Sequence, residues 1–391
     1  MESTALLDAA QRYANQACIL YENNNLNEAV ELYKEALSIY SATNNLEEYY
    51  SVAAKINEIY FRFSQFRECI RFMKETLAAF PNTPQTPLNI VEIYVELGNT
   101  YCAIEEFEQG IEAFRKGLEV NLKKFGDEPH VLLNRCYNGI GLSYSRIRQA
   151  DLGIPYFEKA LAVGVALWGN HHEYNSRSYM GLALCWFLKK NYNEALHYIN
   201  SSLEIGRTIK HQPLPALASD LGLMARCYSE MGDYDKALLY FQQAVHTAQS
   251  AFHHNPHPLT VSIYENMGKC VGKKGDTQAE INYYQKALQI SSDFYKSDNI
   301  RTAELQQKIG WWYAQNPKAY KQAIPYFEQS VAIYQSIVGT EHPLVVSGNN
   351  AIAECYLCLN EPQKAYNNLT KSLEQVEKTS LGETHLEAGN T

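Results

Sequence analysis

Apolar and polar residues recur along this chain with the spacing of amphipathic helices, and the whole pattern returns at intervals of 40 to 43 residues. One position in the first helix of each copy favours a short side chain, and it is occupied in turn by Ala17, Asn57, Gly98, Gly141, Ala183, Ala225, Gly268, Gly310 and Ala353. A bulky position in the second helix keeps the same period, at Tyr33, Met73, Phe114, Phe157, Ile199, Phe241, Tyr284, Phe327 and Leu369. Two series with one period predict nine tandem helix pairs.

The stretch Leu221–Ser250 is the clearest copy. Ala225 and Ala237 are small where two antiparallel helices would cross closely, and Tyr228 and Phe241 would fill the space beside them. A Gly-Asp pair breaks the helical pattern between the two halves. The sequence therefore predicts an all-α chain built from paired helices.

The regularity of the copies divides the chain into four parts. Residues 1–80 hold copies 1 and 2, which match the pattern least well and are expected to pack irregularly. Residues 81–87, PNTPQTP, contain three prolines, which prevent a continuous helix and predict a connection or minor boundary. Residues 88–378 carry copies 3 to 9 in regular register, with Glu280 in a slot that is otherwise small and one residue added to the turn of copy 8. Residues 379–391 lack periodicity and predict a polar, disordered tail.

The helix-pair pattern resembles the tetratricopeptide repeat (TPR) superfamily, which has Leu-Gly and Tyr in its first helix and spaced Ala and aromatic residues in its second. The ordinary repeat of that superfamily has 34 residues, so each copy here is longer by about eight. Connections such as QSIVGTEHPLVV and NPHPLTVS are similar to the Gly-x-x-His-Pro segments of the repeats in kinesin light chains. The resemblance implies an α-solenoid of about nine repeats, wound as a right-handed superhelix, whose first helices line a concave groove for peptides or partner helices.

Composition and charge argue against membranes and nucleic acids as partners and indicate the cellular compartment. Apolar residues make up 46% of the chain, but no run reaches the roughly 18 apolar residues of a membrane span, which predicts no membrane insertion. The net charge of -9 argues against nucleic-acid binding, because phosphate neutralisation needs Lys and Arg. The nine cysteines fall singly in helical patterns, which fits a reducing compartment and predicts a cytoplasmic protein.

Recurrent His and Cys residues are interpreted as structural. A histidine returns at the same connection in four copies, at His130, His172, His257 and His342. We expect each to cap the start of a first helix and not to bind a metal. A cysteine likewise returns two residues after the small slot, at Cys185, Cys227, Cys270 and Cys355, so the C-x-x-C that ends at Cys358 is interpreted as packing. No phosphate-binding loop, metalloprotease or hydrolase motif occurs, and we expect neither a cofactor nor catalysis.

The register also predicts which first-helix residues face the groove, namely those three and six places before the small slot and the one after it. The residues singled out as a peptide- or partner-binding surface are Arg135, Asn138, Arg177, Met180, Arg226, Glu265, Lys269 and Trp311. The four cations among them form a predicted basic strip that suits a carboxylate or a phosphorylated peptide, with Asn for a peptide amide and Trp as an anchor. The competing interpretation is that these cations pair with neighbouring glutamates.

The function expected from these features is that of a non-catalytic scaffold or adaptor, which binds a peptide or a partner protein with an acidic segment. Two alternatives stay open. One is a peptide-sensing regulator similar to the Rap proteins, without a DNA-binding domain because copy 1 is expected to begin close to the N-terminus. The other is a trafficking adaptor similar to the SNAP proteins, for which no distinctive motif occurs. An enzyme is the alternative from a different class.

Overall fold

The computed structural model describes residues 2–63, 65–79, 87–126, 128–208, 214–296, 298–370 and 373. All regular secondary structure in these ranges is α-helical, which confirms the predicted fold class. The Pro-rich connection at 81–87, apart from its last residue, and the tail at 379–391 lie outside the described residues.

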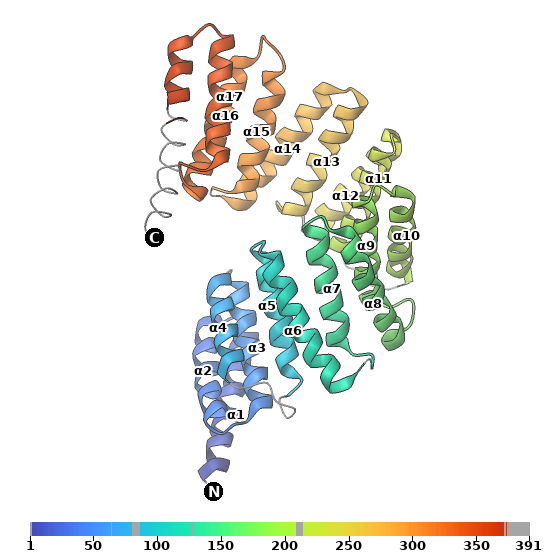
Figure 1. Ribbon diagram of the computed structural model, residues 1–391, viewed down its shortest axis with the longest axis vertical. Coiled ribbons are helices and arrows are strands. Elements are labelled where there is room, and N and C mark those ends of the chain that lie inside the picture. Colours follow the sequence, from blue (N-terminus) through green and yellow to red (C-terminus); the bar gives the residue numbers. More distant parts are fainter. Residues whose placement is uncertain are drawn as a thin grey trace, which may run out of the picture. The chain divides into compact units, whose positions relative to one another are not determined.

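The first of two compact units is Met1–Lys210. Along the chain its helices are α1 (Glu2–Glu22), α2 (Leu26–Ala42), α3 (Leu46–Arg62), α4 (Phe66–Ala79), α5 (Asn89–Ala103), α6 (Phe107–Phe125), α7 (Val131–Arg146), α8 (Ala150–Trp168), α9 (Glu173–Leu188) and α10 (Tyr192–Thr208). Each odd-numbered helix packs against the even-numbered helix that follows it, so each predicted copy is one helix pair (Figure 1).

The second unit is His211–Thr391, and it continues the same pairing. Its helices are α11 (Leu214–Glu230), α12 (Tyr234–Ala251), α13 (Pro258–Lys274), α14 (Thr277–Tyr295), α15 (Ile300–Ala314), α16 (Tyr320–Val338) and α17 (Pro343–Cys358), and a further helix covers residues 362–370. The division between the units falls in the connection from copy 5 to copy 6. The longer turn expected in copy 8 is confirmed, because five residues separate α15 from α16.

The small slot of the first helix and the bulky slot of the second meet inside each copy. A Cβ atom added to Gly98 would lie 2.7 Å from the ring of Phe114. Gly268 approaches the ring of Tyr284 equally closely, at 2.7 Å, so an aromatic ring fills the space that the missing side chain leaves. The small slot is therefore required by close helix packing.

The same rings also join each copy to the next one. A Cβ atom on Gly139, in α7, would lie 2.5 Å from the ring of Phe114, in α6. A Cβ on Gly181, in α9, would lie 2.1 Å from Phe157, in α8. Each of these rings is thus enclosed between glycines of two successive first helices, which stacks neighbouring copies on each other.

The histidine caps predicted from the connections are confirmed. The four N-cap histidines precede α7, α9, α13 and α17, and Nδ1 of each accepts a hydrogen bond from the backbone N–H two residues later, over 3.1 to 3.3 Å. Asn299 takes the same place before α15, where its Oδ1 accepts from the Arg301 N–H over 2.8 Å. These side chains satisfy backbone donors that the first turn of a helix leaves without a partner.

The recurrent cysteines are buried at helix contacts, as the packing interpretation requires. Cys185, Cys227 and Cys270 are fully buried and Cys355 nearly so, whereas Cys358 is exposed. Among the described residues, no group of His, Cys, Asp or Glu has a geometry that could hold a metal ion. None of the described helices combines the length and the apolar character needed to cross a membrane.

Candidate functional site

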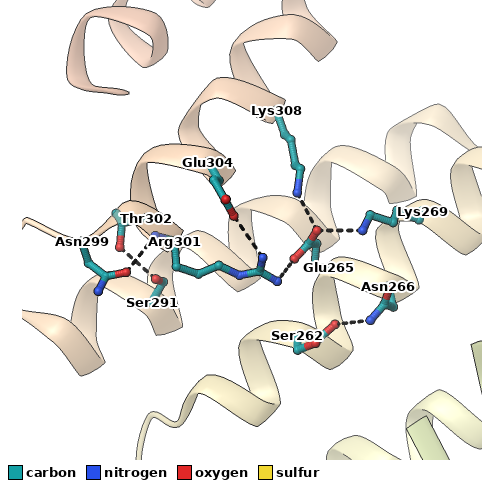
Figure 2. A network of polar contacts seen from close by, with 10 residues as sticks. All are labelled: Ser262, Glu265, Asn266, Lys269, Ser291, Asn299, Arg301, Thr302, Glu304 and Lys308. Atoms are coloured by element: carbon teal, nitrogen blue, oxygen red, sulfur yellow. Dashed lines mark hydrogen bonds and ion pairs between the residues drawn. The ribbon is translucent and has the colours of Figure 1, made fainter. Parts of the chain in front are cut away.

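In the second unit, three cationic side chains contact one buried carboxylate. All four residues lie on the first helices of two successive copies, α13 and α15. Glu265, in the middle of α13, is 2% exposed. Lys269 donates to it from the next turn of the same helix, over 2.8 Å. Arg301 and Lys308 reach it from α15, the latter over 2.6 Å (Figure 2).

The local sequence places these cations at one point. Lys269 follows Glu265 by four residues, which puts the two side chains on one helix face. Arg301 and Lys308 are seven residues apart, so they share one face of α15. The Asn299 cap fixes the start of α15, and Arg301 also contacts Glu304 over 3.1 Å.

The electrostatics keep Glu265 ionised inside the protein. Burial by itself raises the pKa of its carboxyl, but hydrogen bonds from Lys269 and Lys308 and their positive charges outweigh burial and hold that pKa at about 2. We call Glu265, Lys269, Arg301, Glu304 and Lys308 the Glu265 cluster. Three cations and two carboxylates give it one net positive charge.

The cationic heads of the Glu265 cluster still reach solvent. The side chains are 49% exposed for Lys269, 36% for Arg301 and 37% for Lys308. Their shared contact with Glu265 already restrains these side chains. Binding a ligand would therefore cost less side-chain entropy here than at lysines that move freely.

Arg226 lies on α11, the preceding first helix of this unit, and is partly buried. Burial lowers the pKa of its guanidinium, whereas the negative charges of Glu230 and Glu265 act in the opposite direction. Its charge therefore interacts with the Glu265 cluster without belonging to it.

In the first unit two of the predicted site residues, Arg135 and Asn138, are engaged by other residues of the protein. Arg135, on α7, forms ion pairs with Glu96 and, over 3.4 Å, with Glu92, both on α5. Asn138 is 7% exposed, donates to the Asn134 side chain over 3.0 Å and accepts from Ser178 Oγ over 3.0 Å. The structure thus gives Asn138 an internal role in joining α7 to α9.

Two further predicted residues lie on α9. Arg177 is exposed and makes no hydrogen bond or ion pair to any residue in the part of the chain that the structure describes. Met180, one turn later, is half-buried. The pairing with glutamates that was weighed against the basic strip therefore holds for Arg135 and Lys269, but not for Arg177.

Trp311, the predicted aromatic anchor, is 43% exposed on α15. It lines a cavity of about 520 Å³ together with residues of α17 and of the connection before it. The remaining lining residues are Glu341, Pro343, Val346, Ser347, Asn350, Ala351 and Glu354.

The register did not single out Arg301 and Lys308. They stand nine and two residues before the small slot of copy 8, outside the three slots assigned to the groove. Long side chains reach sideways to the neighbouring repeat, so slot position alone does not decide which cations meet. A visible signal was the i, i+7 spacing of two cations in the first helix of copy 8, next to a first helix in copy 7 whose single acidic residue is Glu265.

Comparison with protein families gives one consistent result. Models of the tetratricopeptide repeat match residues 9–47 and 91–124, and a run of overlapping matches covers 176–250, 221–293, 259–336 and 318–378. The overlapping run alone spans more than half of the chain. A sequence search of curated proteins gave no match.

Solved structures with TM-scores above 0.5 share the fold at low sequence identity. The apo form of the quorum sensor NprR from B. thuringiensis is 14% identical, with a TM-score of 0.60 over 96% of this chain and 98% of that one. A Rap protein in complex with Competence and Sporulation Factor is also 14% identical, with a TM-score of 0.55 over 96% of this chain and 99% of that one. A putative kinesin light chain from Podospora anserina is 20% identical over 53% of this chain and 98% of that one, with a TM-score of only 0.44.

Proposed function

Because the chain belongs to the tetratricopeptide repeat family, we propose that it is a non-catalytic interaction protein whose first-helix face binds a peptide or a segment of a partner protein. In the second unit the proposed contact surface is the Glu265 cluster, with Arg226 and Trp311 beside it on the first helices. In the first unit we propose Arg177 and Met180 as contacts, since both are accessible on α9.

The Glu265 cluster is the observation that carries this proposal. Its three cations have about eleven N–H donors, whereas its two carboxylates have about eight acceptor sites. The donors therefore exceed what the cluster itself can accept, and a third or more of each cationic side chain is in solvent. A carboxylate of an acidic segment supplies further acceptors for the cationic N–H groups that face solvent.

Peptide sensing is the second candidate. The NprR and Rap structures match this chain over nearly its whole length, and the Rap structure is a complex with Competence and Sporulation Factor. At 14% identity this likeness supports the fold alone, and the thermal shift experiment below tests the proposal that a short peptide is the ligand. We also propose a cytoplasmic location, supported by nine cysteines in the free thiol form.

A thermal shift experiment with the full chain tests the proposed function. Two pools of short blocked peptides are compared, one rich in Asp and Glu, the other with Asn and Gln in their place. We expect the acidic pool to raise the unfolding midpoint of this 391-residue chain, by roughly 2 °C at a tenfold excess over the Kd, because only the folded state binds.

Substitutions in the Glu265 cluster test whether the thermal shift arises from binding there. In the double variant Lys269→Gln and Lys308→Gln the shift should fall by more than half, measured against the variant's own midpoint. Lys321→Gln, at an exposed position on α16, is the matched control and should keep the full shift. Equal shifts from both pools, or an unchanged shift in the double variant, would contradict binding at the Glu265 cluster.

A further inference from the structure

We propose that the cavity beside Trp311 is a binding site for a cationic side chain, an arginine or lysine of the bound segment. The cavity lies between α15 and α17, and its volume of about 520 Å³ falls within the roughly 300 to 1,000 Å³ of ordinary ligand pockets. The inference rests on the proposed function and names a second chemical group of the same ligand.

Trp311 offers a fixed aromatic surface. Its indole packs edge-on against the buried ring of Phe327, with ring centroids 5.1 Å apart and an interplanar angle of 74°. Phe327 is fully buried and also fills the space over Gly310, so this support does not move easily. The remaining 43% of Trp311 is exposed, and Trp is the aromatic side chain that attracts cations most strongly.

The polar lining of the cavity has a single sign of charge. Glu341 and Glu354 line it, and it has no cationic lining residue. Neither glutamate has a hydrogen bond or ion pair to the residues for which the structure gives a placement. Two unneutralised carboxylates beside an indole attract an ammonium or a guanidinium and repel an anion.

The position of the cavity in the repeat register supports a role in binding a segment. Trp311 and Glu354 occupy the slot just after the small residue in copies 8 and 9, and Lys269 occupies it in copy 7. Along three successive first helices this slot therefore holds a cation, an indole and a carboxylate. Lys308 stands one turn before Trp311 on α15, so the Glu265 cluster adjoins the cavity.

The ligand class follows from this juxtaposition. The Glu265 cluster takes an acidic group, whereas the cavity beside Trp311 takes a basic one. A segment that carries both, in one order along its length, would contact both sites at once and gain from the high effective concentration of the second group. A uniformly acidic segment would leave the cavity without a partner.

The cavity is tested with fluorotryptophan-labelled full-length protein and ¹⁹F NMR. The chain has four tryptophans, and Trp311→Phe identifies the Trp311 signal. The probes are acetyl-arginine amide and its uncharged analogue acetyl-citrulline amide. Both probes are compared by the shift of the Trp311 signal on titration. We expect the arginine probe to bind with at least about threefold higher affinity than the citrulline probe.

The double variant Glu341→Gln and Glu354→Gln should abolish the preference for arginine. Glu328→Gln, at an exposed position on α16, should retain it. A Trp311 signal that never moves with the arginine probe, or that moves equally with both probes, would overturn the proposal. This outcome is independent of the acidic peptide pool, so failure of the cavity and failure of the Glu265 cluster can be told apart.

A second measurement tests whether one peptide contacts both the Glu265 cluster and the cavity beside Trp311. One blocked peptide with Asp and Arg separated by a short spacer is compared with the same peptide containing citrulline. We expect the loss of affinity on changing Arg to citrulline to disappear in the Glu341→Gln and Glu354→Gln variant. The same loss in both proteins would show that the arginine binds elsewhere.

Discussion

At the scale of single residues, the fold depends on glycines that make room for aromatic rings. The ring of Phe114 is buried and is approached closely by both Gly98 and Gly139, so a side chain at either position would collide with it. Gly272 has a similar role in copy 7, where a Cβ would lie 2.7 Å from the Glu280 carboxyl carbon. This explains how Glu280 is tolerated in a slot that is otherwise small.

We predict that Gly98→Ala destabilises the protein although alanine favours the helix by about 1 kcal/mol. Overpacking a closed core costs typically 1 to 3 kcal/mol, and the added Cβ lies only 2.7 Å from a fully enclosed ring, so the net effect should be a lower thermal midpoint. Gly222→Ala is the control, because its nearest neighbour atom would be 3.9 Å away, and its midpoint should rise or stay the same. Opposite results in these two variants would refute the packing account.

Residue-level roles could be predicted from the sequence only where they repeat. The small slots, the buried cysteines and the histidine caps recur in several copies, so register alone reveals them. Glu265 occurs once. Its slot predicted a groove residue, whereas its burial depends on Arg301 and Lys308, which reach it from the next repeat.

At the scale of helices, the starts of the first helices are set by single side chains in the connections. His257 begins α13, and its ring stacks on Phe252 with a centroid distance of 3.4 Å and lies edge-on to Phe294. This burial lowers the pKa of His257 below its ordinary value of 6.5. Protonation of Nδ1 would also remove the acceptor that caps the helix.

The cap at His257 predicts a pH dependence of stability. Because its pKa is lower in the folded state than in the unfolded state, the stabilising contribution is present above pH 6.5 and is lost as the pH falls through the folded-state pKa. His257→Asn should remove this contribution to the pH dependence while keeping a cap, as Asn299 does before α15. Thermal midpoints of both proteins between pH 5 and pH 8 check this. Parallel curves would show that His257 does not titrate with folding.

Helix boundaries were predictable because the connections carry their own signals. His-Pro marks the starts of α13 and α17, and the added residue of copy 8 lengthens the turn before α16. The side chains that meet between neighbouring first helices were not predictable in this way, since a contact such as Arg135 with Glu96 depends on side-chain length and direction.

At the scale of the whole molecule, the chain consists of one kind of helix pair divided into two compact units. The minor boundary expected at 81–87 stays a prediction, and the two units divide between copies 5 and 6, where the sequence predicted no boundary. The repeat pattern continues across that point without interruption, so periodicity gave no signal of it.

The repeat architecture assigns separate tasks to the two helices of each pair. Second helices contribute the buried rings that hold successive copies together, whereas first helices in the second unit carry the Glu265 cluster and Trp311 on an accessible face. We propose that a partner binds the first-helix face. Binding by this face differs from binding by the second helices, which also expose charged residues such as Lys321 and Glu328.

Site-specific photocrosslinking tests that claim most directly. The crosslinking residue p-benzoylphenylalanine is placed at Asn350, exposed on α17, or at Glu328, exposed on the second helix α16, and each protein is irradiated in lysate of the cells that produce it. We predict a discrete adduct from position 350 that excess unmodified protein suppresses, and none from position 328. Adducts of equal yield from both positions, or only from position 328, would contradict binding by the first-helix face.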